Sequence, residues 1–488
     1  MRKITLVELL PNSSAPDVKV TGLHYDSRRV EPGFVFFAVP GFKEDGAKYV
    51  PAAFANGAVA AVVEKGAAVP AEFRDRCQEV DGVRRALAEA AAAFYEFPAQ
   101  RLALFGVTGT KGKTSSTYLL EAVLRESGKK TALVGGVQCW HPGARFDSKL
   151  TTMESLDLQK FLSDAVNAGA EVAVLEVSSH ALSLDRVWGC HFQGVLFTNL
   201  YEDHLDFYGS MDPYFAAKKL LFDEPYRGSG TVAVANLDSI YGTRLVAECP
   251  GKWNTFGKNK GDFPVTHSEY SEAGVRLEID AGPGGKVKVD SQLFGAFNEQ
   301  NVAGVAVLAL ALGYPVETIQ RGIASLAAVP GRVERVPTSL PFSVFVDYAH
   351  MGPALENVLT SLRPFCKGAL SVVVGAGGDR PPERRTGLGA AAAKLADFTV
   401  ITSDNPRTED PRKIISAVEK AFLDAGGGLY QIEPDRRAAI RLALQKAKPG
   451  DIICIAGKGH ESGQTIGTKT MPFDDRVEAA AALRDLEA

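Results

Sequence analysis

The chain has 488 residues, enough for roughly two to four domains of ordinary size. Its net charge of −4 argues against a general nucleic-acid binder, which carries a basic excess. The six cysteines form no C-x-x-C pair, which excludes a disulfide framework and favours the reducing cytoplasm. The apolar runs are too short to span a bilayer, and the first residues lack a signal-peptide pattern. We therefore expect a cytoplasmic protein with neither a membrane nor a nucleic acid as partner.

The first 98 residues predict a small α/β domain with one dense polar turn, Tyr25-Asp26-Ser27-Arg28-Arg29, before a strand at residues 34–39. Ser27, Arg28 and Lys43 could hold a phosphate or a uracil-like edge, because such groups suit oriented donors and cations. The residues alone favour the alternative, a pair of solvated turns. An alanine-rich helix follows, and we place the first domain boundary near residue 98.

A phosphate loop is the strongest motif of the chain. Residues 102–107 are typical of a buried parallel strand, and residues 115–124 have helical spacing. Between them lies Gly109-Thr110-Lys111-Gly112-Lys113-Thr114, where backbone N–H groups, the Lys113 cation and the Thr114 hydroxyl suit a phosphate with Mg²⁺. Val107 stands where the ordinary loop has its first glycine, so this is a shortened variant. A chance Gly-Lys-Thr is the alternative, but the flanking strand and helix favour ATP or GTP binding.

Residues 99–330 form the expected nucleotide domain, an open α/β sheet whose ligands would bind beyond the carboxyl ends of its strands. Polar groups follow three strands or loops there, at Thr151-Thr152, at residues 176–180 and at residues 198–206. Glu176 and His204 are candidate Mg²⁺ ligands beside Thr114. A carboxylate at such a strand end could instead cap a helix or pair with a lysine.

Two further positions of this domain have an ordinary structural interpretation. Lys218 and Lys219 lie on an otherwise apolar helix and are expected at the surface. Asn298 precedes a helix expected at residues 302–312, where it could cap the helix or reach the nucleotide.

The α/β alternation restarts after residue 330 without a second phosphate loop. We expect strands at residues 344–347, 370–375 and 398–402, with helices at residues 353–362 and 385–396. Polar clusters follow four strands: Asp347-Tyr348-Ala349-His350, Gly377-Gly378-Asp379-Arg380, Asp404-Asn405-Pro406-Arg407 and Gly457-Lys458-Gly459-His460-Glu461. Because parallel strands end at one edge of a sheet, these clusters predict one wall of a cleft in a Rossmann-like domain of residues 331–488.

Taken together, these motifs resemble one family of ligases along the whole chain. They are, in order, GTKGKT, LTTMESLD, EVSSHAL, FTNLYEDHLDFYG, YFAAKKLLF, FGAFNEQN, GRVERV, VDYAHMGPAL, GAGGDR, SDNPRTEDP and AGKGHE. The chain resembles the Mur ligases of peptidoglycan synthesis, and among them those that add meso-2,6-diaminopimelate to UDP-N-acetylmuramoyl-L-alanyl-D-glutamate. The resemblance implies three α/β domains, ATP as co-substrate, an acyl phosphate intermediate and a role in cell wall biogenesis, cell shape and cell division; we expect a monomer.

The resemblance also assigns residues to each ligand. For ATP these are Gly109, Thr110, Lys111, Gly112, Lys113, Thr114, Ser115, Asn298, Arg332 and Asp347. For the UDP-sugar dipeptide they are Ser27, Thr151, Thr152, Ser178 and Arg186. For diaminopimelate they are Arg380, Asp404, Asn405, Pro406, Arg407, Gly457 and Glu461. For Mg²⁺ they are Thr114, Glu176, His204 and Lys218 as a carbamate, and the resemblance makes Lys113, Lys218 and His204 catalytic.

Two other functions stay open from the sequence. A folylpolyglutamate synthetase shares the shortened phosphate loop but should lack the Asp-Asn-Pro-Arg stretch and the first domain. A regulatory ATPase would need neither a third-domain pocket nor a lysine poised for carbamylation. Phosphate release that requires both an acceptor and an amino acid would distinguish a ligase from such an ATPase.

Overall fold

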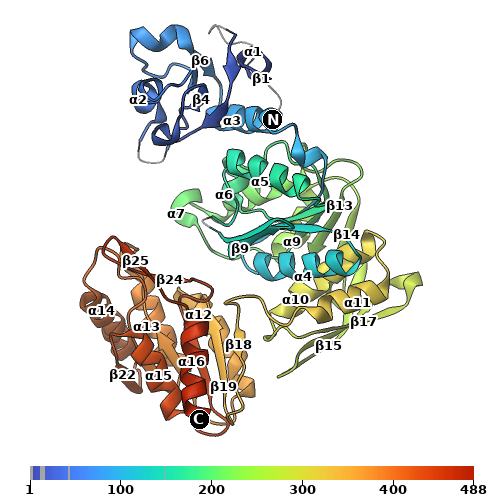
Figure 1. Cartoon of the computed structure of the whole chain (residues 1–488). Helices are drawn as coiled ribbons and strands as arrows, with labels where there is room; N and C mark the ends of the chain where they lie inside the picture. The colour runs from blue at the N-terminus through green and yellow to red at the C-terminus, as the bar shows by residue number, and fades with distance from the viewer. Residues whose placement is uncertain (1–3, 11–16, 42–43, 149, 488) are drawn as a thin grey trace. The chain divides into compact units, whose positions relative to one another are not determined.

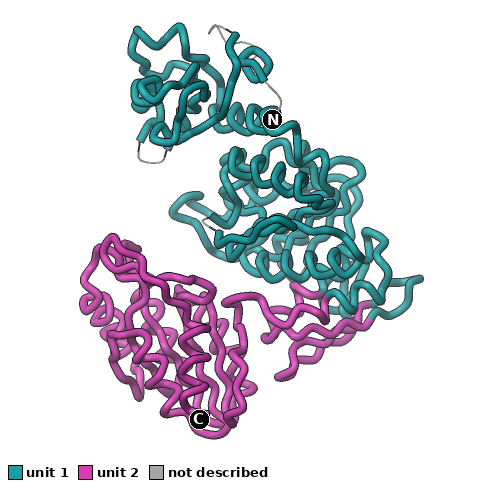
Figure 2. The backbone as a smooth tube through the Cα atoms, viewed as in Figure 1, with its two compact units in different colours: residues 1–265, 280–287, 303–322 teal, residues 266–279, 288–302, 323–488 magenta. Residues whose placement is uncertain are grey.

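The computed structural model describes residues 4–10, 17–41, 44–148 and 150–487, and in this part of the chain helices alternate with strands that form several sheets (Figure 1). The predicted α/β class is therefore confirmed. Lys43 lies outside the described residues. Backbone contacts divide the chain into unit 1, residues 1–265, 280–287 and 303–322, and unit 2, residues 266–279, 288–302 and 323–488 (Figure 2). The domain boundaries at residues 98 and 330 stay a prediction.

The amino-terminal part of unit 1 is a four-stranded parallel sheet in the order β3-β4-β5-β6, comprising Gly22–His24, Phe34–Phe37, Ala60–Glu64 and Cys77–Val80. Alternate side chains of β4 face opposite sides, as the two-residue period of a strand requires. Val35 and Phe37 join one apolar cluster with α3 (Val83–Phe94), and Phe36 joins another with α2 (Val50–Ala55). Both faces of the sheet are thus covered.

The nucleotide-binding part of unit 1 has a sheet whose central strands are parallel, in the order β8-β11-β7-β12-β13-β14. Their bounds are Thr131–Val134, Val172–Glu176, Ala103–Thr108, Phe192–Phe197, Val232–Asn236 and Trp253–Lys258. The predicted strand at residues 102–107 is confirmed to within one residue, and α4 (Lys113–Glu126) follows the phosphate loop as expected. The register brings the carboxyl ends of β11, β7 and β12 to one edge.

The remaining elements of this part lie around the parallel strands. Strands β9 (Gln138–His141) and β10 (Ala144–Asp147) extend the sheet in antiparallel pairing beyond β8. The helices between the strands are α5 (Ser155–Asn167), α6 (Ser179–Ser183), α7 (Leu205–Tyr208), α8 (Met211–Lys219) and α9 (Ile240–Glu248).

Strands β15 (Phe263–Ser271), β16 (Gly274–Asp280) and β17 (Lys286–Ser291) are neighbours in that order, and most of their residues belong to unit 2. Two helices follow them, α10 (Asn298–Ala311) and α11 (Val316–Ser325). Helix α10 begins four residues before the predicted start, so Asn298 is its first residue.

The carboxyl-terminal part of unit 2 is a six-stranded sheet in the order β18-β19-β23-β20-β21-β22, comprising Glu334–Val336, Ser343–Asp347, Ile452–Ala456, Leu370–Val374, Phe398–Ile401 and Leu429–Ile432. All pairs are parallel except β18 with β19. One apolar cluster lies between the sheet and helices α12 (Gly352–Leu362), α13 (Glu383–Leu395) and α14 (Pro411–Asp424). A second cluster includes α15 (Arg436–Lys446) and α16 (Asp475–Glu487), as expected of a doubly wound domain.

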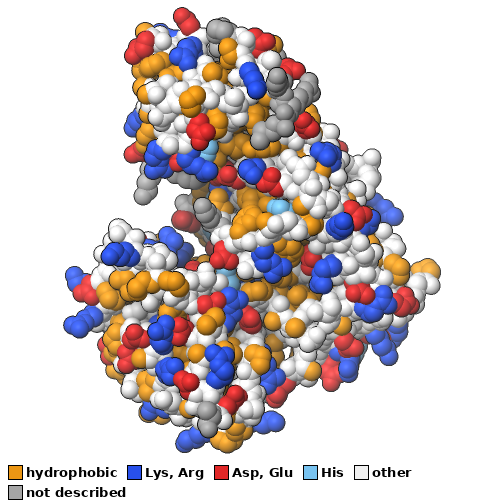
Figure 3. All heavy atoms as spheres, in the orientation of Figure 1, with side chains coloured by type: hydrophobic (Ala, Val, Ile, Leu, Met, Phe, Trp, Pro, Cys, Tyr) orange, Lys and Arg blue, Asp and Glu red, His pale blue; other side chains and the backbone are white. Residues whose placement is uncertain are grey.

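The surface agrees with a chain of small net charge. Figure 3 shows Lys and Arg side chains interspersed with Asp and Glu on the face in view. Within the described ranges, we find no helix that combines the length and hydropathy needed to span a bilayer.

Candidate active site

The phosphate loop is held in shape by the end of the neighbouring strand β12. Gly109 has a φ of +150°, and a Cβ placed on it would lie 1.9 Å from Thr198 Oγ1, so a larger residue does not fit. Thr198 Oγ1 donates to the carbonyl of Lys111 at 2.7 Å, and Asn199 Oδ1 accepts from the Lys111 N–H at 2.9 Å. Gly112, with a φ of +85°, leads into α4. The loop backbone is therefore fixed at the helix N-terminus, where an anion is favoured.

Two lysines point at the same carbonyl of this loop. Lys113 Nζ donates to the carbonyl of Gly109 at 2.9 Å and to that of Thr110 at 3.1 Å. Lys218, from α8, donates to the Gly109 carbonyl at 2.9 Å and is 1% exposed, so the prediction that it lies at the surface is wrong. Burial lowers the pKa of Lys218 well below its usual value, and the Lys113 cation lowers it further, against an opposing effect of Asp203. Burial and the neighbouring cation thus both disfavour the charged form of the Lys218 amine.

The other predicted residues of the loop lie in the same place. Thr114 and Ser115 are buried in the first turn of α4. Thr110 Oγ1 shares a 3.0 Å hydrogen bond with the hydroxyl of Tyr214, which comes from the same helix as Lys218. Helix α8 thereby packs directly against the phosphate loop.

The carboxyl end of β11 brings together four predicted residues. Glu176 is 1% exposed, its Oε1 accepts from the Gly136 N–H at 2.8 Å, and its carbonyl accepts from Thr152 Oγ1 at 2.7 Å. The Ser178 N–H donates to Thr152 Oγ1 at 3.1 Å. A Cβ on Gly136 would lie 3.3 Å from Thr151 Oγ1, which places Thr151 beside this cluster. The hydrogen bond from Gly136 N–H therefore helps to hold the Glu176 carboxylate in place.

Arg186 connects this cluster to the amino-terminal sheet. Its Nη1 donates to the carbonyl of Thr152 at 3.2 Å, and its Nη2 pairs with Glu154 Oε1 at 2.7 Å. Arg84, from α3, pairs with the other oxygen of Glu154 at 3.4 Å. Two arginines from different parts of unit 1 thus share one carboxylate.

Ser27 lies in the first turn after β3. It is 7% exposed, and its carbonyl accepts from Asn56 Nδ2 at 2.9 Å. Arg28 beside it is exposed and pairs with Asp26 at 2.8 Å. The turn is ordered by Asp26, which caps it through the Arg28 N–H.

A second histidine accompanies His204. The two rings, His204 before α7 and His180 from α6, have centroids 4.8 Å apart, and His204 also contacts the ring of Tyr214 at 6.0 Å. Burial lowers the pKa of His204. Burial, followed by the nearby His204, Arg186 and Lys218, lowers the pKa of His180 to about 4. Sequence reasoning did not assign His180 to the site, although its position directly after β11 was a usable indication.

In unit 2, Asp347 and Arg332 lie close together. Asp347 ends β19, and its two oxygens accept from the N–H groups of Val333 and Ala349, both at 2.7 Å. The Arg332 guanidinium lies 5.1 Å from the centroid of the Tyr348 ring. Asp347 therefore fixes both the segment that carries Arg332 and the turn after β19.

Asn298 is not the cap of a helix at residue 302. It is 2% exposed, its Nδ2 donates to the carbonyl of Phe294 at 2.7 Å, and its Oδ1 accepts from Asn301 Nδ2 at 2.9 Å. The side chain thus orders the turn that opens α10.

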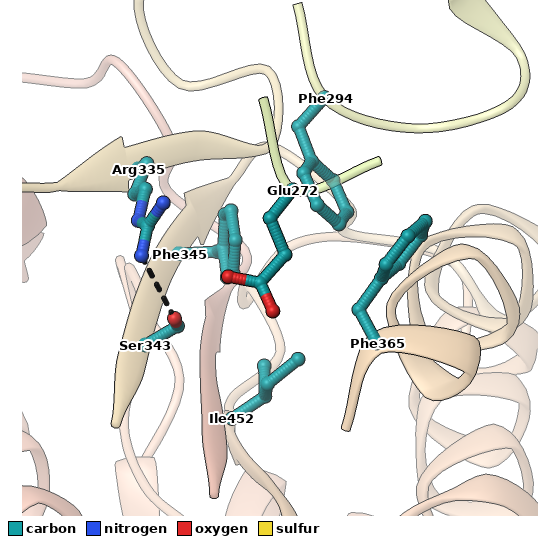
Figure 4. Close-up of a pocket in the computed structure, with 7 residues that line it drawn as sticks. All are labelled: Glu272, Phe294, Arg335, Ser343, Phe345, Phe365 and Ile452. Carbon is teal, nitrogen blue, oxygen red and sulfur yellow. Dashed lines mark hydrogen bonds between the residues drawn. The ribbon is translucent and has the colours of Figure 1, made fainter. Parts of the chain in front are cut away.

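Two adjoining pockets of unit 2 have aromatic walls. Figure 4 shows the first, lined by Glu272, Phe294, Arg335, Ser343, Phe345, Phe365 and Ile452. Arg335 Nη2 donates to Ser343 Oγ at 3.2 Å there, and the Phe294 ring lies 4.8 Å from that of Phe345. The second pocket shares Phe294 and Phe345 and is also lined by Arg332. Predicted site residue Arg332 therefore lines a pocket that contains both aromatic and charged side chains.

The predicted amino-acid wall forms at the carboxyl edge of the six-stranded sheet. Arg407 has a φ of +53°, its N–H donates to the carbonyl of Thr465 at 3.1 Å, and its carbonyl accepts from Gly467 N–H at 2.6 Å. Its Nη1 donates to the carbonyl of Gly378 at 2.7 Å. A Cβ on Gly377 would lie 2.9 Å from Arg407 Nη1 and 3.9 Å from Arg380 Cγ, so both arginines flank that glycine.

The rest of the wall packs tightly around Asp404 and Asn405. Both are buried, and a Cβ on Gly457 would lie 2.7 Å from Asp404 Oδ2. Asn405 Nδ2 donates to Glu461 Oε2 at 2.8 Å. A Cβ on Gly378 would lie 1.9 Å from the carbonyl of Pro406. The structure thus brings all the residues assigned to diaminopimelate to one sheet edge.

Comparison with known proteins agrees with this arrangement. Three models of one family match the chain: "Mur ligase family, catalytic domain" at residues 19–95, "Mur ligase middle domain" at residues 107–309 and "Mur ligase, glutamate ligase domain" at residues 331–459. A relative from Synechococcus elongatus named UDP-N-acetylmuramoyl-L-alanyl-D-glutamate–2,6-diaminopimelate ligase is 44% identical over 98% of this chain and 97% of its own. The chain belongs to the Mur ligase family. A second relative of that name, from Solibacter usitatus, is 42% identical over 97% and 96%.

Solved structures of Mur ligases share the fold. One described as UDP-N-acetylmuramoyl-L-alanyl-D-glutamate–2,6-diaminopimelate ligase has a TM-score of 0.69 at 30% identity and covers 100% of both chains. A folylpolyglutamate synthase from Mycobacterium tuberculosis, in complex with ADP and AMPPCP, has a TM-score of 0.61 at 17% identity over 82% of this chain and 95% of its own. At that identity the likeness extends to the fold alone.

Proposed function

We propose that this Mur ligase uses ATP to join meso-2,6-diaminopimelate to UDP-N-acetylmuramoyl-L-alanyl-D-glutamate, as a cytoplasmic step of peptidoglycan precursor synthesis. The relatives above carry the name of this activity over nearly their full length. The observation that carries the proposal is one sheet edge that holds Arg407 and Arg380 as well as the hydrogen-bonded pair of Asn405 and Glu461.

The chemistry of that edge suits diaminopimelate better than lysine. Diaminopimelate carries a second carboxylate, and a guanidinium binds carboxylate through two parallel hydrogen bonds. We assign that carboxylate to Arg407 and the neighbouring ammonium to Glu461. L-lysine would leave the Arg407 fork without its anionic partner, which is how a site rejects a ligand that lacks one polar group.

The proposed reaction has two chemical steps. A carboxylate oxygen of the D-glutamyl residue attacks the γ-phosphorus of ATP, ADP leaves, and an acyl phosphate forms. The neutral amine of diaminopimelate then attacks the carbonyl carbon, inorganic phosphate leaves, and the amine nitrogen loses a proton. Lys113 and the N–H groups at the start of α4 stabilise the charge on the phosphoryl group in transfer.

The residues that we assign to Mg²⁺ supply mainly oxygen donors, which this ion prefers. The described residues contain no group of three or more His, Cys, Asp or Glu side chains that could hold a metal. Mg²⁺ needs only one or two carboxylates, because water and phosphate oxygens complete its shell. We assign Glu176, Thr114, His204 and carbamylated Lys218 to it; when bound, the ion would neutralise phosphate charge.

The burial of Lys218 supports the carbamate. A neutral amine can attack CO₂, forming an N–C bond with loss of a proton, and the product is an oxygen-donor anion. The depressed pKa of the amine favours that step. Carbamylation would also replace the repulsion between Lys218 and Lys113 by attraction.

The remaining assignments are part of the same proposal. Ser27, Thr151, Thr152, Ser178 and Arg186 would bind the UDP-sugar dipeptide, and Asn298, Arg332 and Asp347 the nucleotide. The chain would comprise a UDP-sugar domain (residues 1–98), an ATP domain (99–330) and an amino-acid domain (331–488). We also propose that the enzyme is a monomer.

Phosphate release tests the proposal. The enzyme should release phosphate from ATP only when the UDP-muramoyl-dipeptide and an amino acid are both present, and meso-diaminopimelate should support far more release than L-lysine. Release with a folate and glutamate would favour the folylpolyglutamate alternative. Release without any acceptor would indicate an ATPase instead.

A further inference from the structure

Lys458 is a fully buried cation beside the amino-acid wall, and the assignments above give it no role. It follows β23, between Gly457 and Gly459, whose φ angles are +120° and +54°. Its side chain is 0% exposed. A Cβ on Gly459 would lie 2.8 Å from Tyr348, so the turn that carries Lys458 is held against the turn after β19.

All three donors of the Lys458 ammonium have acceptors. Nζ donates to Gly463 O at 2.7 Å, to Glu461 Oε2 at 2.9 Å and to Asn405 Oδ1 at 3.1 Å. The ammonium thus joins the Asp-Asn-Pro-Arg loop, the turn after β23 and the strand β24 (Gly463–Ile466). A buried cation with this set of partners is favourable only because each partner is present.

These contacts fix the orientation of the two groups that face the ligand. Asn405 Oδ1 accepts from Lys458 and from the Thr465 N–H at 2.9 Å, which turns its Nδ2 toward Glu461. Glu461 Oε2 therefore receives two donors, and the rotation of the carboxylate is set. The Glu461 side chain remains 31% exposed, so its other oxygen can face a ligand.

The same contacts reach Arg407. Thr465, which donates to Asn405, accepts from the Arg407 N–H at 3.1 Å through its carbonyl. One turn of chain thus connects the Lys458 ammonium to the backbone of the arginine that we assign to the second carboxylate.

We propose that Lys458 is a positioning residue for the amino-acid substrate: it holds Glu461 and Asn405 in the orientation that receives the ammonium end of a diamino acid. The proposal rests on the proposed function and deepens it. Lys458 contacts no substrate itself, and its effect on binding passes through Glu461.

The test compares Lys458→Met with Lys469→Met, an exposed lysine of β25 (Lys469–Pro472) in the adjoining hairpin. We expect Lys458→Met to raise the KM for meso-diaminopimelate about 10- to 100-fold, the effect of losing a hydrogen bond to a charged group. The kcat at saturating amino acid should stay within about threefold, and the KM for ATP should not change. Lys469→Met should match the wild type.

A double-mutant cycle shows whether the effect passes through Glu461. Glu461→Gln should itself raise the KM, and adding Lys458→Met should raise it by no more than about twofold further. Full multiplication of the two effects would overturn the proposal, as would a wild-type KM for Lys458→Met.

Lys458→Gln is a second variant for the case that Lys458→Met misfolds, because its amide keeps a hydrogen-bond donor for Asn405 without the charge. It should give a KM between those of the wild type and Lys458→Met. If neither variant folds, as judged by circular dichroism, or if both raise the KM for ATP as well, the role is structural and the proposal falls. A wild-type enzyme without diaminopimelate-dependent phosphate release would refute the proposed function instead.

Discussion

Replacement of Arg407 by alanine tests the specificity of the proposed ligase. The guanidinium is aimed by a 2.7 Å hydrogen bond from Nη1 to the Gly378 carbonyl, and its backbone is fixed by Thr465 and Gly467. A hydrogen bond to a charged group contributes about 1.5–3 kcal/mol, so loss of a two-bond fork costs about 3–6 kcal/mol. We therefore expect kcat/KM for meso-diaminopimelate to fall by about 10²- to 10⁴-fold.

Two further variants separate charge, fork geometry and backbone strain. Arg407→Lys keeps the cation but not the fork, and should lose about 10- to 100-fold. Arg407→Gly should lose as much activity as the alanine variant while gaining about 1 kcal/mol of stability, because glycine tolerates the φ of +53°.

The assay is amino-acid-dependent phosphate release with ATP and the UDP-muramoyl-dipeptide, and Arg412→Ala on the exposed start of α14 is the matched control. The KM for ATP should stay unchanged in all variants, and the preference for diaminopimelate over L-lysine should shrink. Equal turnover of diaminopimelate by Arg407→Ala and wild type would refute the reasoning.

Three other changes have defined outcomes. Lys218→Ala should reduce phosphate release at least about 100-fold, and added formate or acetate should restore part of it. Lys219→Ala should release phosphate at the wild-type rate. A folded Lys218→Ala variant that neither acid rescues would contradict the carbamate. Gly109→Ala should abolish ATP-dependent turnover, because its Cβ would clash with Thr198. Gly128→Ala, whose Cβ would have nothing within 4 Å, should keep turnover and lose about 1 kcal/mol of folding stability. An active Gly109→Ala enzyme would disprove the clash with Thr198. Asp475→Asn should lower the free energy of unfolding in urea by about 3–5 kcal/mol, because it leaves the buried Arg436 without its charged partner. Glu478→Gln, in the more exposed pair with Arg437, should lower it by under about 1 kcal/mol. Equal effects of the two variants would contradict the role of burial.

Local sequence patterns predicted most of the fold that positions the site. Apolar runs and glycine loops placed β7, α4, β19, β20 and β21 to within two residues, because strand and helix periods are local properties. The polar clusters after the carboxyl-terminal strands do lie at one edge, since parallel pairing aligns the strand ends. The helix at Asn298 was mispredicted because polar residues fill its first turn.

Burial and side-chain contacts could not be predicted in the same way. Lys218 and Lys219 are neighbours in sequence, but only the fold decides that Lys218 turns toward the phosphate loop. His180 contacts the ring of His204, 24 residues later in the sequence, and Lys458 contacts an asparagine 53 residues earlier. Such contacts depend on which strands are neighbours, information that periodicity does not contain.

The single carbonyl shared by Lys113 and Lys218 couples two chemical events. A phosphate group that attracts Lys113 away from Gly109 leaves that carbonyl to Lys218, and the proposed carbamylation of Lys218 would replace its ammonium by a single neutral N–H, a weaker competitor of Lys113 for the carbonyl. By thermodynamic linkage, if carbamylation changes the affinity for the nucleotide by some factor, the nucleotide changes the affinity of the amine for CO₂ by the same factor. Dissolved CO₂ would then act on this enzyme as an effector, and nucleotide affinity measured in degassed buffer should differ from that in bicarbonate.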